Sequence, residues 1–77
     1  MIEAEHRVIE VISKALKTQV KRDTKMRDVA TWDSLGHLSV LVALDTEFDN
    51  KIGGIKEIAS ADSVQRILDI LKKEQVI

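Results

Sequence analysis

Apolar residues recur every three to four positions in three stretches of this chain, which is the period of an α-helix that buries one face. The first stretch predicts a helix from about Ile2 to Leu16. Its polar residues Glu3, Glu5, Lys14 and Lys17 are expected to point outward. Its apolar face is expected to consist of Val8, Ile9, Ile12, Ala15 and Leu16. The function predicted for this helix is packing alone.

A second helix is predicted to begin at Ser34 and to run to about Phe48. Asp33 stands directly before it, where a carboxylate can accept a hydrogen bond from the backbone amide of Leu35 or Gly36. Ser34 then becomes the first helical residue, with its hydroxyl at the open end of the helix. At about 100° per residue, one face of this helix holds Leu35, Leu38, Leu41, Val42 and Phe48.

Two connections separate the helical stretches. Residues 19–31 form a long polar connection, which we expect Val20, Met26 and Val29 to anchor to the core. After Phe48 the chain is expected to break at Asn50 or at the glycine pair 53–54. A short third helix is then predicted around Ile55, Ile58 and Ala59.

The last helix is predicted to be capped by Asp62 or Ser63. Its final turns carry Lys72 and Lys73, where the helix dipole favours positive charge. Its apolar face is expected to consist of Val64, Ile67, Leu68 and Leu71.

Composition supports an all-α fold. The 77 residues include no proline and only three glycines, and 44% of them are apolar. Three longer helices and one short third helix predict a small four-helix bundle that forms a single domain over residues 1–77. A chain of this length buries only about 60% of its unfolded surface, so large cavities and multi-residue active sites are not expected.

The chain has no cysteine, so we expect neither a disulfide nor a zinc site made of thiolates, and no metal site is predicted. The longest apolar run, residues 40–44, is far shorter than the roughly 20 residues that span a bilayer. The N-terminal residues lack the basic and apolar regions of a secretory signal. We therefore expect a cytoplasmic protein without a membrane partner.

Charge is unevenly distributed along the chain, although the net charge is only -1. Residues 32–50 hold four acidic residues and no basic one. This stretch predicts electrostatic steering toward basic partner surfaces, and it makes nucleic acid a poor partner. Trp32 is expected to pack within the loop, whereas His37 is expected to be a half-exposed surface residue on the first turn of the helix.

Ser34 is the candidate site that this pattern singles out. The amides of the first helical turn have no partner within the helix, and the dipole presents partial positive charge there. A phosphate esterified to Ser34 would therefore lie in a favourable electrostatic field.

The sequence Asp33-Ser34-Leu35, followed by an apolar helix and by Glu47-Phe48, resembles the region of acyl carrier proteins that carries 4′-phosphopantetheine. The resemblance extends over nearly the whole chain and suits a freestanding carrier. It implies that Ser34 bears the group and that Asp33 and Leu35 are flanking residues read by the modifying enzyme. That enzyme is a Mg²⁺-dependent phosphopantetheinyl transferase, which takes the group from coenzyme A.

The resemblance also implies a non-catalytic monomer that carries acyl groups as thioesters on the arm. Its partners are the transferase and the acyl-loading and acyl-transfer enzymes, which present basic docking surfaces. The residues expected to meet these partners are Leu35, Val40, Asp45, Glu47 and Asp49. The implied pathway is fatty-acid-like, polyketide or another specialised biosynthesis. Gly36 and Ser39 replace acidic residues usual in fatty-acid carriers, and His37 replaces a threonine, which favours a specialised pathway.

Two alternatives remain open. Asp33, Ser34 and His37 stand close together as in a serine hydrolase, and Gly36 matches half of a nucleophile elbow. Trp32 occupies the place of the first elbow glycine, no strand precedes the serine, and a small bundle offers little room for a substrate cleft. The other alternative is an acidic-faced helical interaction module, whose helix 32–49 docks on a partner without modification.

Overall fold

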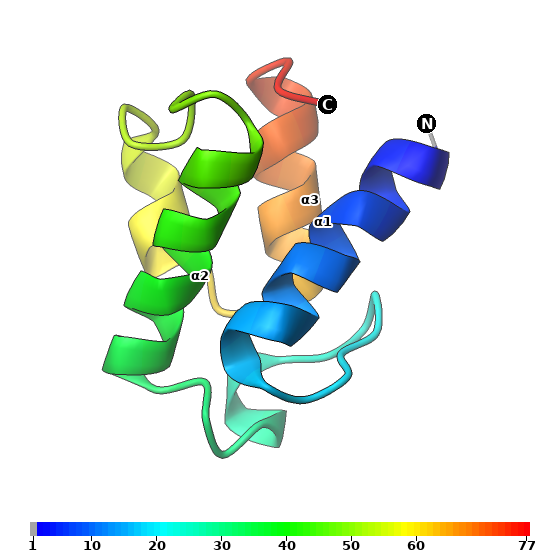
Figure 1. Ribbon diagram of the computed structural model, residues 1–77, viewed down its shortest axis with the longest axis vertical. Helices are drawn as coiled ribbons and strands as arrows, with labels where there is room; N and C mark the ends of the chain where they lie inside the picture. The colour runs from blue at the N-terminus through cyan, green and yellow to red at the C-terminus, as the bar shows by residue number, and fades with distance from the viewer. Residues whose placement is uncertain (1) are drawn as a thin grey trace.

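The computed structural model describes residues 2–77, and Met1 lies outside the described residues. The fold is all-α, as predicted, and none of the described residues belongs to a β-strand. None of the described helices is long and apolar enough to cross a membrane. The elements in chain order are α1 (Ile2–Leu16), the 3₁₀ helix η1 (Met26–Asp28), α2 (Ser34–Glu47), the 3₁₀ helix η2 (Lys56–Ser60) and α3 (Val64–Lys73) (Figure 1).

The segment predicted as a short third helix is η2, so residues 2–77 form three α-helices and not four. Backbone amides in this segment bond three residues back, from Ile58 to the Ile55 carbonyl at 3.4 Å and from Ala61 to the Ile58 carbonyl at 3.2 Å. Five residues with this spacing close a tighter helix than the α form. The apolar pattern therefore located the segment correctly, but it gave the wrong helix type.

The end of α2 is set by residues other than the glycine pair. Asp49 and Asn50 both adopt left-handed backbone conformations, with φ of 56° and 63°, which these two residue types tolerate better than most. The Asn50 amide donates to the Asp45 carbonyl at 2.7 Å. The Asp45 carboxylate then accepts from the amides of Ile52 and Gly53, both at 3.0 Å, and so orders the following loop.

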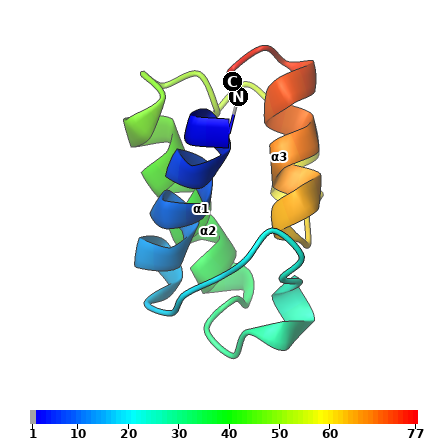
Figure 2. The same ribbon diagram turned by 90° about the vertical axis from the view of Figure 1, so that its right-hand side faces the viewer.

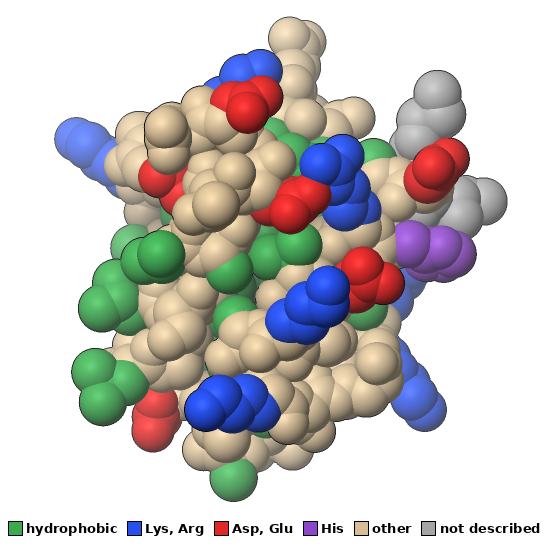
Figure 3. All heavy atoms as spheres, in the orientation of Figure 1, with side chains coloured by type: hydrophobic (Ala, Val, Ile, Leu, Met, Phe, Trp, Pro, Cys, Tyr) green, Lys and Arg blue, Asp and Glu red, His purple; other side chains and the backbone are tan. Residues whose placement is uncertain are grey.

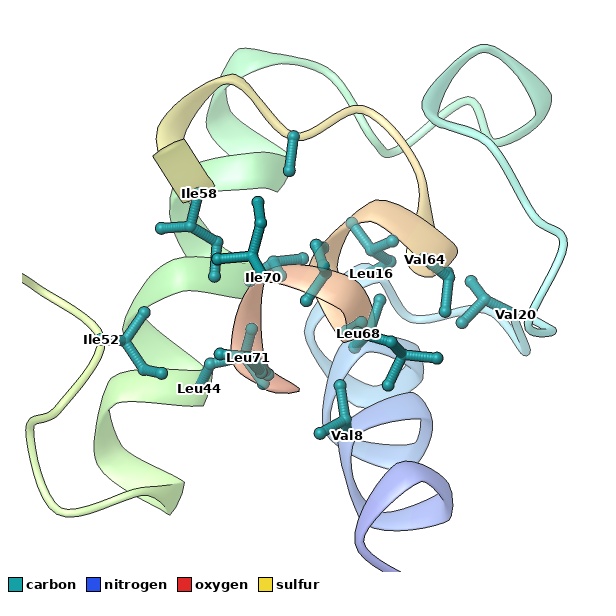
Figure 4. Close-up of a cluster of buried hydrophobic side chains, with 14 of the residues drawn as sticks. Val8, Leu16, Val20, Leu44, Ile52, Ile58, Val64, Leu68, Ile70 and Leu71 are labelled. Atoms are coloured by element: carbon teal, nitrogen blue, oxygen red, sulfur yellow. The ribbon is translucent and has the colours of Figure 1, made fainter. Parts of the chain in front are cut away.

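The three α-helices surround one hydrophobic core. α1 runs opposite to α2 and α3, and residues 17–31 cross the end of the bundle at which α2 begins (Figures 1 and 2). Apolar side chains from all three helices and from the connections converge between them (Figure 4). The most deeply buried of these are Val8, Ile12, Leu16, Val20, Val40, Leu44, Ile52, Ala61, Val64, Ile67, Leu68 and Leu71.

Most of the predicted core contacts are confirmed. The buried residues of α1 and α3 include Val8, Ile12, Leu16, Val64, Ile67, Leu68 and Leu71, all expected from the apolar period, and also Ile70, which was not assigned to the apolar face. Val20 is buried, and Met26 and Val29 pack against the core, so the long connection is anchored as predicted. Ser63, rather than Asp62, caps α3, because its hydroxyl accepts from the Arg66 amide at 3.1 Å.

Glu5 was predicted to point outward and is instead buried, with 6% of its surface exposed. Its carboxylate forms ion pairs with Arg22 of the connection and Lys72 of α3. Hydrogen bonds from Arg22 and Lys72 lower the pKa of Glu5 to about 2. The helical period could not reveal this burial, because the two cations come from distant parts of the chain.

The face that α2 buries also differs from the prediction. The core side of α2 holds His37, Val40 and Leu44. Three residues assigned to the apolar face are exposed to solvent: Leu35 is 76%, Leu38 56% and Val42 59% exposed. Because α2 is apolar on more than one side, its period alone does not decide which side meets the core.

Candidate functional site at the start of α2

Ser34 is the first residue of α2 and is exposed at the end of the bundle. Asp33 precedes it in an extended conformation, and its carboxylate accepts from the Gly36 amide at 2.9 Å, as predicted for an N-cap. Within residues 2–77 the Ser34 hydroxyl makes no hydrogen bond. The helix start therefore depends on Asp33, and the Ser34 hydroxyl remains available for chemistry.

The turn that carries Ser34 is fixed on the side of α1. The Thr31 hydroxyl donates to the Leu16 carbonyl at the end of α1, at 2.7 Å. Gly36 faces the same segment so closely that a Cβ atom there would lie 1.9 Å from the Thr31 carbonyl oxygen. Only a residue without a side chain fits this approach. This role of Gly36 leaves no trace in the hydrophobic pattern, because it depends on a contact between two backbone segments.

The same turn is fixed to the core through Trp32 and His37. Trp32 is only 2% exposed, which confirms its predicted packing role, and its indole N–H donates to His37 Nδ1 at 3.0 Å. His37 was predicted to be a surface residue, but it is 6% exposed and its Nε2 lies 2.9 Å from the Ile58 carbonyl oxygen. The predicted exposure of His37 was wrong because the ring is covered by contacts with residues such as Ile58, which lies 21 residues away along the chain and is not visible in the local pattern.

Two of the acidic residues predicted to face partners are engaged within the molecule. Asp45 is half-buried and bonds the loop after α2. Glu47 forms an ion pair with Arg7 of α1, whose guanidinium also lies 5.6 Å from the centre of the Phe48 ring. Asp33 and Asp49 are exposed. The acidic stretch is therefore less available to a partner than its charge count suggests.

The two apolar residues predicted to meet partners lie in opposite environments. Val40 is fully buried in the core, so it is not accessible to a partner, and that prediction is wrong. Leu35, by contrast, is the most exposed of the large apolar residues described. Together with Leu38 and Val42 it forms an apolar stripe along the outer side of α2, and hydrophobic side chains gather over this helix at the left edge of Figure 3.

A small groove of about 270 Å³ lies between α2 and η2. Its walls are formed mainly by Leu41, Val42, Ile52, Ile55, Ile58 and Ala59. Leu41 lies seven residues after Ser34, which corresponds to about 10 Å along the helix axis. A larger groove of about 1050 Å³ lies between α1 and the second half of α2, and charged residues of both signs line it. The smaller groove also has one acidic and one basic residue in its lining, Asp45 and Lys56.

Comparison with known proteins does not assign the chain to a family. No protein-family model matches it, and neither the curated proteins nor the solved structures searched include a match.

Proposed function

We propose that this chain is a cytoplasmic acyl carrier protein that bears 4′-phosphopantetheine on Ser34. The observation that carries the proposal is the state of this hydroxyl: it is exposed, makes no hydrogen bond within residues 2–77, and stands at the first position of a helix that Asp33 caps. The neighbouring Thr31 is bonded to the end of α1, Trp32 is bonded to His37, and Gly36 lies against the Thr31 backbone. A free hydroxyl on a rigid turn suits a group that an enzyme must reach.

The electrostatics of the helix start favour a phosphodiester at this position. Asp33 uses the Gly36 amide, but the amides of Ser34 and Leu35 have no partner within the helix. Negative charge at a helix N-terminus is stabilised by about 0.3–1 kcal/mol. The attached group would supply a terminal thiol that holds an acyl chain as a thioester, and the chain itself contains no cysteine.

The residues around Ser34 support modification by a separate enzyme. Ser34 Oγ would form a new P–O bond to the phosphate that carries pantetheine, the pyrophosphate bond of coenzyme A would break, and adenosine 3′,5′-bisphosphate would leave. A base must take the hydroxyl proton. His37 is the nearest histidine, but its ring nitrogens bond Trp32 and Ile58, so the base would come from the transferase. The same engagement of His37 argues against a serine hydrolase.

The surface of α2 supports a docking role next to Ser34. Leu35, Leu38 and Val42 form the apolar stripe on the outer side of this helix, and such a stripe is typical of a protein-binding surface. Asp33 and Asp49 would add charge for a basic partner, with Asp45 and Glu47 contributing less because they are already bonded. The apolar residues Leu41, Ile52 and Ile55 of the groove between α2 and η2 would contact part of the acyl chain.

The apolar stripe equally supports a second function, an interaction module that binds a partner without any modification. A measurement of the intact mass of the protein distinguishes between the two functions. We expect the protein to gain the mass of one phosphopantetheine when it is incubated with coenzyme A, Mg²⁺ and a broad-specificity phosphopantetheinyl transferase. An unchanged mass, with a known carrier modified in the same reaction, would favour the interaction module.

A further inference from the structure

His37 connects three segments that are separate in the sequence. Its ring belongs to the first turns of α2, its Nδ1 bonds Trp32 in the turn before Ser34, and its Nε2 bonds Ile58 of η2. The indole N–H of the buried Trp32 needs a hydrogen bond within the protein, and the imidazole supplies it. The Ile58 carbonyl accepts from the Ala61 amide as well as from the imidazole. We call these three residues the clamp.

The partners of the clamp fix the protonation state of His37. An indole N–H can only donate, so Nδ1 must accept from Trp32. A backbone carbonyl can only accept, so Nε2 must carry the proton that is donated to Ile58. Only the neutral ring with its proton on Nε2 satisfies both bonds. A second proton on Nδ1 would place two N–H donors against each other.

The surroundings of His37 offer no compensation for a positive charge. At the start of α2 the nearest acid in the sequence is the capping residue Asp33, whose carboxylate accepts from the Gly36 amide. In η2, Glu57 forms ion pairs with Lys73 and Arg66. Beside Trp32, the surface hollow is lined by Lys25, Arg27 and Asp62. Lys56 of η2 adds another positive charge. Among the described residues no ion pair involves the His37 ring.

We infer that His37 is a positioning residue for the modification of Ser34 and that it acts through these two hydrogen bonds. This inference rests on the proposed function of Ser34. The clamp holds Trp32, two residues before Ser34, against α2 and η2. Loss of the bond to Trp32 releases the turn, so Ser34 is no longer presented in one fixed geometry. Modification then slows without loss of the helical fold.

Trp32 is the chain's one tryptophan, so its fluorescence reports directly on the clamp. In His37→Leu, whose side chain can neither donate nor accept, we expect a red shift of the emission and greater quenching by acrylamide than in the wild type at the same pH. Far-ultraviolet circular dichroism should stay constant. The shift should be absent from His37→Gln, whose amide can accept from Trp32 and donate to the Ile58 carbonyl. It should also be absent from His6→Leu, which changes the exposed histidine of α1. An unshifted emission in His37→Leu contradicts the clamp.

The positioning role is tested by the rate of mass gain. At one pH, we expect the initial rate to fall severalfold in His37→Leu and to be restored in His37→Gln, which keeps one donor and one acceptor. If His37→Leu does not fold, Trp32→Phe removes the same hydrogen bond and keeps an aromatic ring, and its rate carries the same test. A folded variant without the hydrogen bond that is modified at the wild-type rate contradicts the positioning role alone. A wild-type chain that gains no mass contradicts the proposed function as well.

Discussion

α2 and α3 start in the same way and then diverge. Each begins with a side-chain cap, Asp33 for α2 and Ser63 for α3, and each cap accepts from the amide three residues later. The next residue differs, because Ser34 is exposed whereas Val64 is fully buried. A capped helix start is therefore not a site in itself. What distinguishes α2 is a free hydroxyl at the first helical position.

The outer sides of the two helices differ as well. α3 buries its apolar residues and presents polar ones to solvent, among them Arg66, Asp69 and Lys73. α2 buries Val40 and Leu44, yet it leaves Leu35 and Leu38 exposed beside Ser34. A monomer gains no stability from apolar side chains in water, so the outer stripe is better explained by a partner. α3 has the pattern of a packing helix, whereas α2 packs on one side and carries on the other the exposed stripe on which we propose that a partner docks.

The largest effect on stability is expected on the inner side of α2, where side chains are buried, and almost none is expected on its outer side. Leu44→Ala should lower the free energy of unfolding by about 2–5 kcal/mol, because it opens a cavity in the core. Leu38→Ala should change stability by no more than about 0.5 kcal/mol, because that side chain is exposed. Chemical denaturation measures both values. Equal losses in the two variants would mean that the outer stripe is part of the core.

The next largest effect on stability is expected at Gly36, where the start of α2 lies close to the Thr31 carbonyl. Gly36→Ala should lower the free energy of unfolding by about 1–3 kcal/mol or more, because its Cβ would overlap the Thr31 carbonyl. Gly54→Ala is the matched control, since nothing lies within 4 Å of a Cβ at that position. Thermal melting of the two variants tests the difference. A Gly36→Ala protein as stable as Gly54→Ala would show that the Thr31 backbone is not held against the first turn of α2.

A smaller, pH-dependent effect is expected where α3 meets α1. The pKa of Glu5 lies at about 2 in the fold against an ordinary value of 4.5, so its ion pairs with Arg22 and Lys72 stabilise the protein above about pH 4.5. This contribution is lost as the pH falls from 4.5 toward 2. Glu57, whose pKa is lowered chiefly by its hydrogen bond with Lys73, acts in the same direction.

The control for this prediction is Glu5→Gln. The variant should be less stable than the wild type at pH 7 and should lose less stability on acidification, as measured by melting temperature across the pH range. Identical acid profiles for the two proteins would contradict the assignment of this ion-pair cluster.

The parts of the fold that local sequence determines were predicted well. The helix starting at Ser34 and the last helix follow from caps that act over three residues, and the apolar faces of α1 and α3 follow from a clean period. The Asp33 cap and the exposed Ser34 belong to this local class. These features could be predicted because their partners lie within one helical turn.

Features that depend on distant partners were not predicted. His37 is buried by Trp32 and by Ile58 of η2, and Glu5 by cations from the connection and α3. Gly36 is required by a backbone contact that only the folded turn creates. The inner side of α2 was assigned incorrectly, because that helix is apolar on two sides and only the assembled core selects one.

The smallest effect on stability and the largest on function are expected at Ser34 itself. Ser34→Ala should keep the helicity and melting temperature of the wild type, because Asp33 caps the helix and the hydroxyl makes no hydrogen bond within residues 2–77. Ser39→Ala is the matched control: it changes the nearest other serine, whose hydroxyl bonds the Leu35 carbonyl at 3.2 Å within α2. Both variants should fold.

Intact mass after incubation with coenzyme A and the transferase, measured on this pair of variants, tests the central claim most directly. We expect Ser39→Ala to gain one phosphopantetheine at the wild-type rate and Ser34→Ala to gain nothing while remaining folded. A mass gain in Ser34→Ala would place the attachment elsewhere in the chain. No gain in either variant or in the wild type would contradict the assignment of a carrier.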